Sequence, residues 1–195
     1  MPATLTQRRM TADEFLALPD DGIERMLIDG ICREPATEIR EMTVRNLVHS
    51  QLTIVLGHFL EQWRRTQPKP RGAAVGGEAG FRLKPDPDGE EAVVGLDLAY
   101  VSHESVARRG TTTMVQGPPI LAVEIVSPHN TDGELSDKVD LLLKCGCKVV
   151  WVVYPKSQTV IVHRPGVAVQ ALDAGDTLTA PELPGFSVPI PMLFE

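Results

Sequence analysis

The sequence predicts a mixed α/β protein, in which a mixed central β-sheet is flanked by helices. A long helical pattern comes early in the chain, and several strand-like segments follow it, interrupted by one further helix. The length of 195 residues and the apolar fraction of 43% suit one domain with a substantial core. We expect a single domain over residues 1–195. It would consist of an N-terminal helix and hairpin at 11–35, a core at 43–163 and an extended C-terminal tail at 164–195.

The first predicted elements are a short helix and a hairpin. Thr11 precedes the helix as its N-cap, and Glu14, three residues later, completes a capping box. A proline and a glycine end this helix. Asp29-Gly30 is a dipeptide typical of the tight turn between two antiparallel strands.

The strongest helical pattern in the chain lies at 43–65. Apolar side chains recur there every three or four residues, which predicts that one face of the helix is buried. The predicted buried stripe consists of Val44, Leu47, Val48, Leu52, Val55, Leu56, Phe59 and Trp63.

The rest of the chain reads mainly as strands. They are predicted at 73–85, 92–101, 120–127, 148–155 and 159–165. The strand at 148–155 is apolar enough to be central in the sheet. A helix is predicted at 131–145, ending at Gly146. The polar segment 102–119 reads as a surface loop or a frayed helix, and the proline-rich end of the chain reads as extended.

Charge, cysteines and hydropathy exclude several classes of protein. With a formal net charge of −7, any nucleic-acid partner would have to be met by a local basic patch. Three cysteines without framework spacing argue against a secreted disulfide scaffold, and Cys145-Gly146-Cys147 is too close for a metal knuckle. We find neither a signal-peptide pattern nor an apolar run of membrane-spanning length, and therefore expect a soluble cytoplasmic protein.

Two carboxylates interrupt apolar strands. Glu124 lies within the segment 120–127, and Asp97 lies within the segment 92–101. A buried carboxylate without a partner costs several kcal/mol or gives up its charge, and two neighbouring carboxylates repel each other. A divalent cation between them would remove this repulsion. Magnesium favours carboxylate oxygens and keeps several of its waters.

A lysine interrupts the apolar face of the helix predicted at 131–145. Lys138 shares this face with Leu135 and Leu142, so it should point toward the sheet. A lysine near the two carboxylates could orient or deprotonate a metal-bound water, or stabilise a developing negative charge. Two carboxylates, a metal ion and a lysine are the groups needed to hydrolyse a phosphodiester.

Each of the three residues also has a structural explanation. Asp97 could cap a turn or accept backbone donors at a strand end. Glu124 and Lys138 could form a plain buried ion pair, and Lys138 could instead extend its ammonium group into water. The occurrence of all three together favours a functional site.

Several segments in a set order resemble one known family. The segments are MTADEFLALPDDG, LIDG, His49 in the long helix, GEAGFRL, LDLAYV, AVEIVSP and DKVDLLLKCGCKVVWVVYP. In this order and spacing the chain resembles the Uma-two family, a bacterial group of restriction-endonuclease-like proteins in the PD-(D/E)XK nuclease superfamily. The resemblance implies a restriction-endonuclease-like core, a mixed central sheet with helices on both sides.

The resemblance also implies site residues. It implies a metal-binding aspartate on one strand and a glutamate on the next, which correspond to Asp97 and Glu124. The superfamily's lysine usually follows the glutamate by two positions, where this chain has Val126. In the family the lysine comes from the following helix instead, and Lys138 matches that position.

Some positions depart from the family pattern. The family's usual aromatic-glutamate pair before LIDG is Arg25 and Met26 here, which removes a carboxylate from the edge of the site. Leu96 replaces the usual proline before the strand aspartate, and Leu142 replaces a tyrosine common in the second helix. The last two changes are conservative enough to be tolerated.

Two accessory residues complete the set. His49 matches the family's helix histidine and could contact a phosphate or the water shell of the metal, or could simply belong to an amphipathic helix. Glu78 could be an extra metal ligand or a carboxylate at a strand end.

The sequence as a whole favours a Mg²⁺-dependent endonuclease, with Mn²⁺ as an alternative ion, that cleaves DNA as a homodimer. Asp97 and Glu124 would bind the metal, and Lys138 would assist the attacking water. An alternative is a catalytically weak or inactive nuclease-fold protein that binds nucleic acid or regulates. A third interpretation is a structural or partner-binding protein with a buried ionic cluster.

Overall fold

The computed structural model describes residues 8–19, 23, 25–34, 46–85, 89–108, 113–127 and 130–195. The elements are α1 (Ala12–Leu16), β1 (Met26–Ile28), β2 (Ile31–Arg33), α2 (Leu47–Thr66), β3 (Ala73–Leu83), β4 (Ala92–Val101), α3 (His103–Ala107), β5 (Val115–Gln116), β6 (Leu121–Ile125), α4 (Asp132–Lys144), β7 (Val149–Tyr154), β8 (Thr159–Arg164), β9 (Val167–Leu172), β10 (Thr177–Thr179), β11 (Ser187–Pro189) and the 3₁₀ helix η1 (Ile190–Leu193). Nine strands form one mixed sheet.

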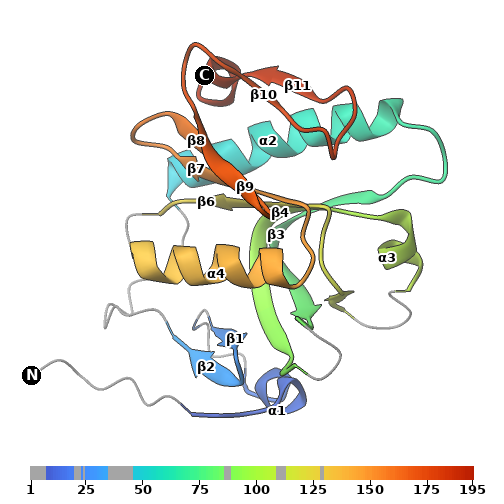
Figure 1. Cartoon of the computed structure of the whole chain (residues 1–195), viewed down its shortest axis with the longest axis vertical. Coiled ribbons are helices and arrows are strands. Elements are labelled where there is room, and N and C mark those ends of the chain that lie inside the picture. The colour runs from blue at the N-terminus through green and yellow to red at the C-terminus, as the bar shows by residue number, and fades with distance from the viewer. Residues whose placement is uncertain are drawn as a thin grey trace, which may run out of the picture.

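The sheet is covered on both faces (Figure 1). Its main path runs β2-β1-β4-β6-β7-β8-β9, and β3 and β5 lie beside β4 off this path. Helix α2 and the C-terminal segment cover one face, and α4 covers the other. Strands β6 and β7 are parallel, and all their residues except Tyr154 at the end of β7 are buried, as expected for central strands with helices on both sides. The predicted fold class is therefore confirmed.

The N-terminal helix and hairpin form as predicted. Thr11 accepts from the backbone of Glu14, whose side chain accepts in return from the backbone of Thr11. Asp29 and Gly30 form the hairpin turn with positive φ angles of 51° and 68°, the conformation that matches the twist of the flanking strands. The hairpin joins the sheet through β1, where Leu27 pairs with Val93 of β4.

Helix α2 is confirmed, but its buried face differs from the predicted one. Asn46 caps the helix, and the buried side chains are His49, Leu52, Leu56, Leu60 and Trp63. Leu47 is 80% exposed and Val48 is also exposed, so the prediction that these two lie in the stripe is wrong. Spacings of three and four residues place His49, not its two apolar neighbours, on the face that meets the sheet. The predicted Val44 lies outside the described residues.

Strand β4 bends at Asp97 because its neighbour β3 carries a bulge. The pairing Gly76 with Leu98 is followed by Ala79 with Leu96, so two residues of β3 oppose one residue of β4. These two residues, Gly77 and Glu78, have positive φ angles of 76° and 60°. Because of this bend, Leu96 packs on the α4 side of the sheet, whereas Leu98, two residues later, packs on the α2 side.

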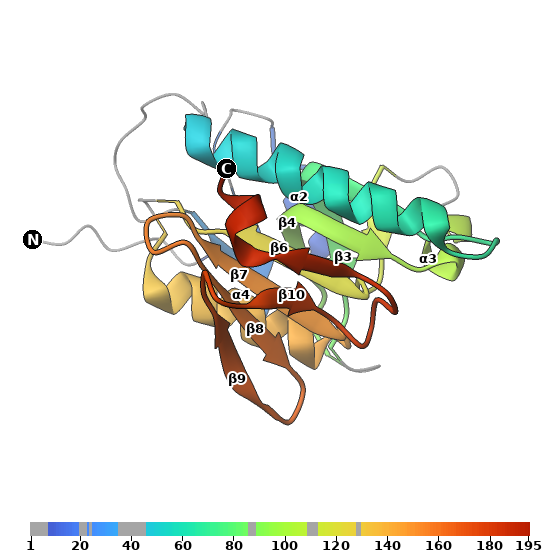
Figure 2. The same ribbon diagram turned by 90° about the horizontal axis from the view of Figure 1, so that it is seen from above.

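The C-terminal segment is more structured than an extended tail. Strand β9 pairs with β8, and β10 and β11 form a small antiparallel sheet followed by η1. Seen from above, this segment lies beside α2 (Figure 2). Leu178, Leu183 and Ile190 are fully buried, and Trp63 of α2 donates a hydrogen bond from Nε1 to the carbonyl of Pro184 at 2.9 Å. The prolines break the regular strand pattern, but the apolar residues between them still anchor the segment on the core.

The polar segment 102–119 also contains regular structure. Ser102 caps the short helix α3, and β5 pairs in parallel with β3. The predicted loop or frayed helix therefore describes the segment only in part, and residues 109–112 lie outside the described residues. None of the helices within the described ranges has both the length and the apolar character required to cross a membrane.

Two alanine substitutions within α2 test the placement of its buried face. Leu52 is 2% exposed, unlike Leu47. We expect Leu52→Ala to lower the free energy of unfolding by about 2–5 kcal/mol because it leaves a cavity. Leu47→Ala should change it by less than about 0.5 kcal/mol. Urea unfolding followed by circular dichroism measures both, and equal losses would contradict this placement.

Candidate active site

Asp97 lies at the point where β4 passes from one neighbouring strand to the next. β4 pairs with β1 at Val93 and with β6 only from Leu98 onward. The Asp97 side chain, 4% exposed, fills the gap that this change of partner leaves. Its Oδ2 accepts a hydrogen bond from the backbone N–H of Ile125 at 2.8 Å. A side-chain carboxylate thus takes the place of a backbone carbonyl in the sheet.

His49 approaches the same carboxylate from the other layer. Its Nε2 lies 3.1 Å from Oδ1 of Asp97, and both side chains are almost completely buried. Helix α2 positions His49 in its first turn, where the Asn46 side chain accepts from the His49 backbone N–H at 2.8 Å. The histidine therefore holds the orientation of the Asp97 carboxylate.

Glu124 faces the opposite layer of the sheet. Val123 and Ile125 of β6 pack toward α2, so the alternation of the strand directs Glu124 toward α4. Glu124 is 8% exposed, and its Oε2 lies 2.7 Å from Nζ of Lys138. The Lys138 side chain is itself only 11% exposed. The structure thus places Lys138 on the buried face of α4, as predicted, and its ammonium group against Glu124 and not in water.

The Asp97 carboxylate contacts the backbone directly beside Glu124. Asp97 binds the N–H of Ile125, the residue that directly follows Glu124. Each carboxylate also contacts a side-chain nitrogen from a different helix. Asp97 contacts His49 of α2, and Glu124 contacts Lys138 of α4. These contacts offset the cost of burying two carboxylates in the centre of the protein.

Glu78 lies on the bulge of β3 that opposes Asp97, but its side chain extends over Gly95. A Cβ atom on Gly95 would lie only 2.6 Å from Oε2 of Glu78, so the glycine makes room for this side chain. Glu78 is half-buried. The structure therefore brings Glu78 to the strand that carries Asp97, two residues away from it along the strand.

The donor atoms of this region suit a hard cation. Within the described ranges, no group of three or more His, Cys, Asp or Glu side chains is arranged to hold a metal ion. The Asp97 and Glu124 side chains offer oxygen atoms only. Two carboxylates fit a divalent ion such as magnesium, which prefers oxygen ligands and keeps several waters. They do not fit a metal that needs sulfur or several imidazoles.

Met26 occupies the position where the family's glutamate is expected. It lies at the start of β1, is partly buried and packs against the apolar cluster on the α4 side of the sheet. The chain therefore has an apolar side chain in an apolar environment at this position, and not a carboxylate. The neighbouring Arg25 pairs with Glu34 at 2.8 Å.

Two cysteines and one further histidine are buried or partly buried away from these carboxylates. Cys145 and Cys147 are buried free thiols, and burial raises the pKa of the Cys147 thiol to about 12, in accord with a packing role. His163 lies on β8, where burial lowers its pKa. His129 lies outside the described residues.

Sequence reasoning missed two features of the site. One is the backbone N–H of Ile125, which no side-chain pattern reveals. The other is the bulge at Gly77 and Glu78, for which a signal existed. Two glycines within a predicted strand often mark a bulge or a close approach of two backbones.

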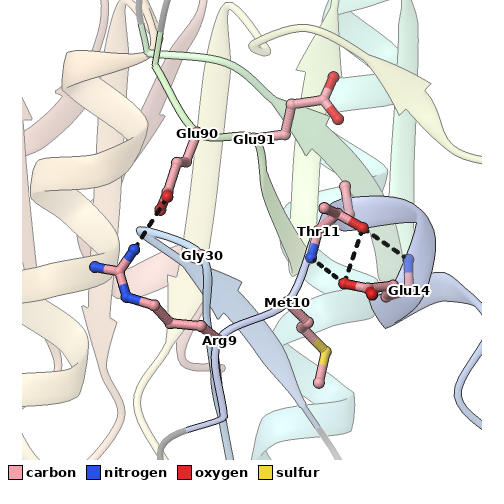
Figure 3. A pocket seen from close by; sticks show the side chains of 8 residues that line it. Arg9, Met10, Thr11, Glu14, Gly30, Glu90 and Glu91 are labelled. Atoms are coloured by element: carbon pink, nitrogen blue, oxygen red, sulfur yellow. Dashed lines mark hydrogen bonds and ion pairs between the residues drawn. The ribbon is translucent and has the colours of Figure 1, made fainter.

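A surface hollow of about 450 Å³ lies away from these carboxylates (Figure 3). It is lined by α1, the β1–β2 turn and the segment before β4, and Arg9 pairs across it with Glu90 at 3.1 Å. Glu14, Glu90 and Glu91 line it beside this one arginine. The excess of negative charge makes this hollow unsuitable for a phosphate group.

Comparison with known proteins identifies a family. The family model Uma2, described as "Putative restriction endonuclease", matches residues 12–192, which confirms the resemblance seen in the sequence. The fold is similar to a crystal structure described as "a putative nuclease belonging to DUF820 from Anabaena variabilis", with a TM-score of 0.77. The two chains are 20% identical over 95% of this chain and 97% of that chain, so the similarity concerns the fold. The search of curated proteins gave no significant match.

A double-mutant cycle tests the Lys138–Glu124 ion pair. We expect Lys138→Met to lower the free energy of unfolding by about 3–5 kcal/mol, because it leaves the buried Glu124 without its cation. Glu124→Gln in the same chain should restore most of this loss, since neither charge is then buried alone. Urea unfolding of the four proteins at neutral pH measures the coupling. Purely additive effects would show that the pair does not stabilise the fold.

Proposed function

Because the chain belongs to the Uma2 family, we propose that it is a nuclease that hydrolyses DNA phosphodiester bonds with the help of a divalent metal ion. One observation carries this proposal. The buried Asp97 accepts a hydrogen bond from the residue that directly follows the buried Glu124, and the largely buried Lys138 contacts Glu124. Phosphodiester cleavage needs these groups, since the metal and a cation together stabilise charge on the phosphate.

Asp97 and Glu124 would hold the metal ion, Mg²⁺ or alternatively Mn²⁺. A divalent ion bound there would polarise a phosphate oxygen and lower the pKa of a bound water. The protein's own part is to hold both carboxylates in place. The N–H of Ile125 and the imidazole of His49 fix Asp97 from two directions. His49 is thus a positioning residue in this proposal, and Glu78 is an accessory carboxylate.

Lys138 would act on the phosphate or on the attacking water. Its ammonium group contacts Oε2 of Glu124 and lies at the α4 face of the site. A fixed cation there would orient the water or stabilise the negative charge that develops on the phosphate oxygens. A homodimer would bring two such sites to the two strands of a duplex, related by a twofold axis.

Calorimetric titration with Mg²⁺ and Mn²⁺ tests the metal site first. We expect the wild type to bind about one ion per chain, and Asp97→Asn to abolish this binding because a neutral amide is a poor ligand for a hard cation. Cleavage of duplex DNA in Mg²⁺ should fall by about 100-fold or more in both Asp97→Asn and Glu124→Gln.

Asp140→Asn serves as the matched control for these variants. It removes an exposed carboxylate from the same helix that carries Lys138, and it should bind metal and cleave DNA as the wild type does. Circular dichroism confirms that each variant is folded. Absence of metal binding by the folded wild type, with and without DNA, would contradict the proposal.

A second candidate function is a nucleic-acid-binding or regulatory module with weak cleavage. It is favoured by Met26, an apolar residue at the position of a family carboxylate. In that case the fold serves to bind nucleic acid, and cleavage is weak because a third acidic group that would complete the metal site is missing.

Substituting Met26 separates the two functions. If the missing carboxylate limits activity, Met26→Glu should raise metal affinity or cleavage by about 10-fold or more, whereas Met26→Gln, of similar size but neutral, should not. Metal affinity from calorimetry and cleavage rates are the measurements. The second candidate would be excluded if the wild type cleaves DNA efficiently, if this cleavage depends on Asp97, and if Met26→Glu does not increase it.

A further inference from the structure

One short segment concentrates positive charge in an otherwise acidic chain. The protein has 26 acidic and 19 basic side chains, yet no acidic residue occurs between Glu61 and Glu78. Four basic residues lie in that interval, namely Arg64, Arg65, Lys69 and Arg71. They occupy the last turn of α2 and the connection to β3. A local patch of this kind is what an acidic protein needs in order to meet a polyanion.

The structure arranges this segment around a hollow of about 570 Å³. We call it the basic hollow, and its lining consists of Arg64, Lys69, Pro70, Arg71 and His103. The hollow is open to solvent, and no acidic side chain lines it. Nearby carboxylates belong to Glu61, which is paired with Arg64 and Arg65, and to Glu104 of α3.

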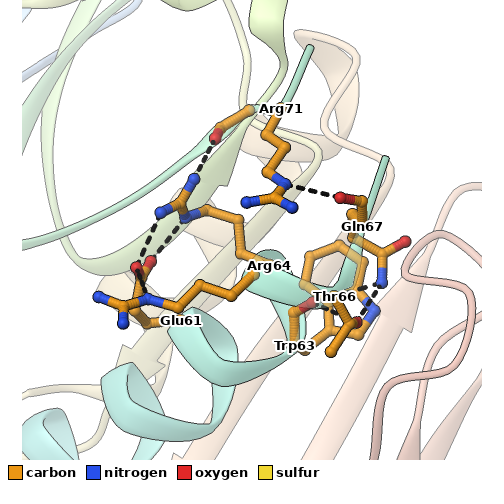
Figure 4. A network of polar contacts seen from close by, with 8 residues as sticks. Glu61, Trp63, Arg64, Thr66, Gln67 and Arg71 are labelled. Carbon is orange, nitrogen blue, oxygen red and sulfur yellow. Dashed lines mark hydrogen bonds and ion pairs between the residues drawn. The ribbon is translucent and has the colours of Figure 1, made fainter. Parts of the chain in front are cut away.

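Hydrogen bonds hold two of the guanidinium groups in place (Figure 4). Arg64 pairs with Glu61 through Nε at 2.6 Å and Nη2 at 2.8 Å, and these contacts lower the pKa of the Glu61 carboxyl to about 2, so the pair stays charged at neutral pH. Arg71 donates from Nε to the carbonyl of Gln67 at 2.6 Å. Fixed side chains lose less conformational entropy when they bind a ligand.

Arg71 keeps donors available for a ligand, whereas Arg64 also donates from Nη1 to the carbonyl of Gly72 at 3.5 Å. The bond from Arg71 to Gln67 uses Nε, so the two terminal nitrogens of its guanidinium group can face a ligand. Lys69 is exposed, and no ion pair with another described residue holds its ammonium group. A planar guanidinium beside a flexible ammonium is a combination suited to phosphate oxygens.

We propose that the basic hollow binds the sugar-phosphate backbone of the nucleic acid on which the site acts. This inference rests on the proposed nuclease function and adds a second contact surface to it. His49 in the first turn of α2 and Arg64 in its last turn are 15 residues apart, which corresponds to ~22 Å along the helix axis. That length equals the rise of roughly six or seven base pairs. A duplex lying along α2 would therefore be long enough to reach from the basic hollow to the turn of α2 that carries His49, the buried partner of Asp97.

The test compares two charge-matched variants. Lys69→Ala with Arg71→Ala removes two charges from the hollow, and Lys148→Ala with Lys156→Ala removes two exposed charges elsewhere. Affinity for a fluorescent DNA duplex is measured by anisotropy in EDTA, which prevents metal-dependent cleavage, over a range of salt concentrations. We expect the hollow variant to bind about 10-fold or more weakly, with a salt slope smaller by about 2. The control variant should bind like the wild type.

The other possible outcomes overturn the proposal, and each shows whether the nuclease proposal fails with it. If the wild type binds DNA but the hollow and control variants have equal affinities and salt slopes, the basic hollow is overturned and the nuclease proposal stands. If the wild type binds no DNA at all, both fail. If the wild type binds inorganic phosphate and the hollow variant does not, but both bind DNA with equal affinity, the hollow is a small-anion site and the proposal is overturned.

Discussion

The contact on which the site depends is the hydrogen bond from the Ile125 backbone to the Asp97 carboxylate. It closes the sheet at the point where β4 no longer pairs with β6, and it does so with a side chain. A buried N–H left without an acceptor would cost about 1–3 kcal/mol, so Asp97 stabilises the fold as well as the site. The same carboxylate contacts His49, which ties α2 to the centre of the sheet.

Each of the two buried carboxylates has a nitrogen partner from a different helical layer, which explains how both can lie within the core. The α2 layer supplies an imidazole to Asp97, and the α4 layer supplies an ammonium to Glu124. A metal ion between the carboxylates would therefore share Glu124 with Lys138. Under the proposed function, metal binding and the Lys138 contact would be energetically coupled, because the ion would have to offset any weakening of the ion pair. The lysine would then be available to the substrate while the metal holds the glutamate.

Much of the site could be predicted because its residues violate local patterns. Asp97, Glu124 and Lys138 each place a charge where periodicity demands an apolar side chain, and the structure puts all three in buried positions. His49 is likewise a polar residue on a buried face, but the sequence pattern did not reveal it because Leu47 and Val48 were expected to lie on that face. The bend at Asp97 depends on how β4 pairs with the bulged strand β3, and the C-terminal hairpin depends on tertiary packing. Neither is encoded in local periodicity.

The distribution of charge sets the orientation in which a polyanion can approach. At physiological ionic strength, charges further apart than about 8 Å are largely screened from each other, so the net charge of −7 matters less than the nearest groups. The α1 end of the molecule presents Glu14, Glu90 and Glu91, whereas the last turn of α2 presents arginines. Under the proposed function, a nucleic acid would therefore be repelled at the α1 end and attracted at the last turn of α2. Helix α2, which carries His49 in its first turn, would then be the axis along which a bound backbone is aligned.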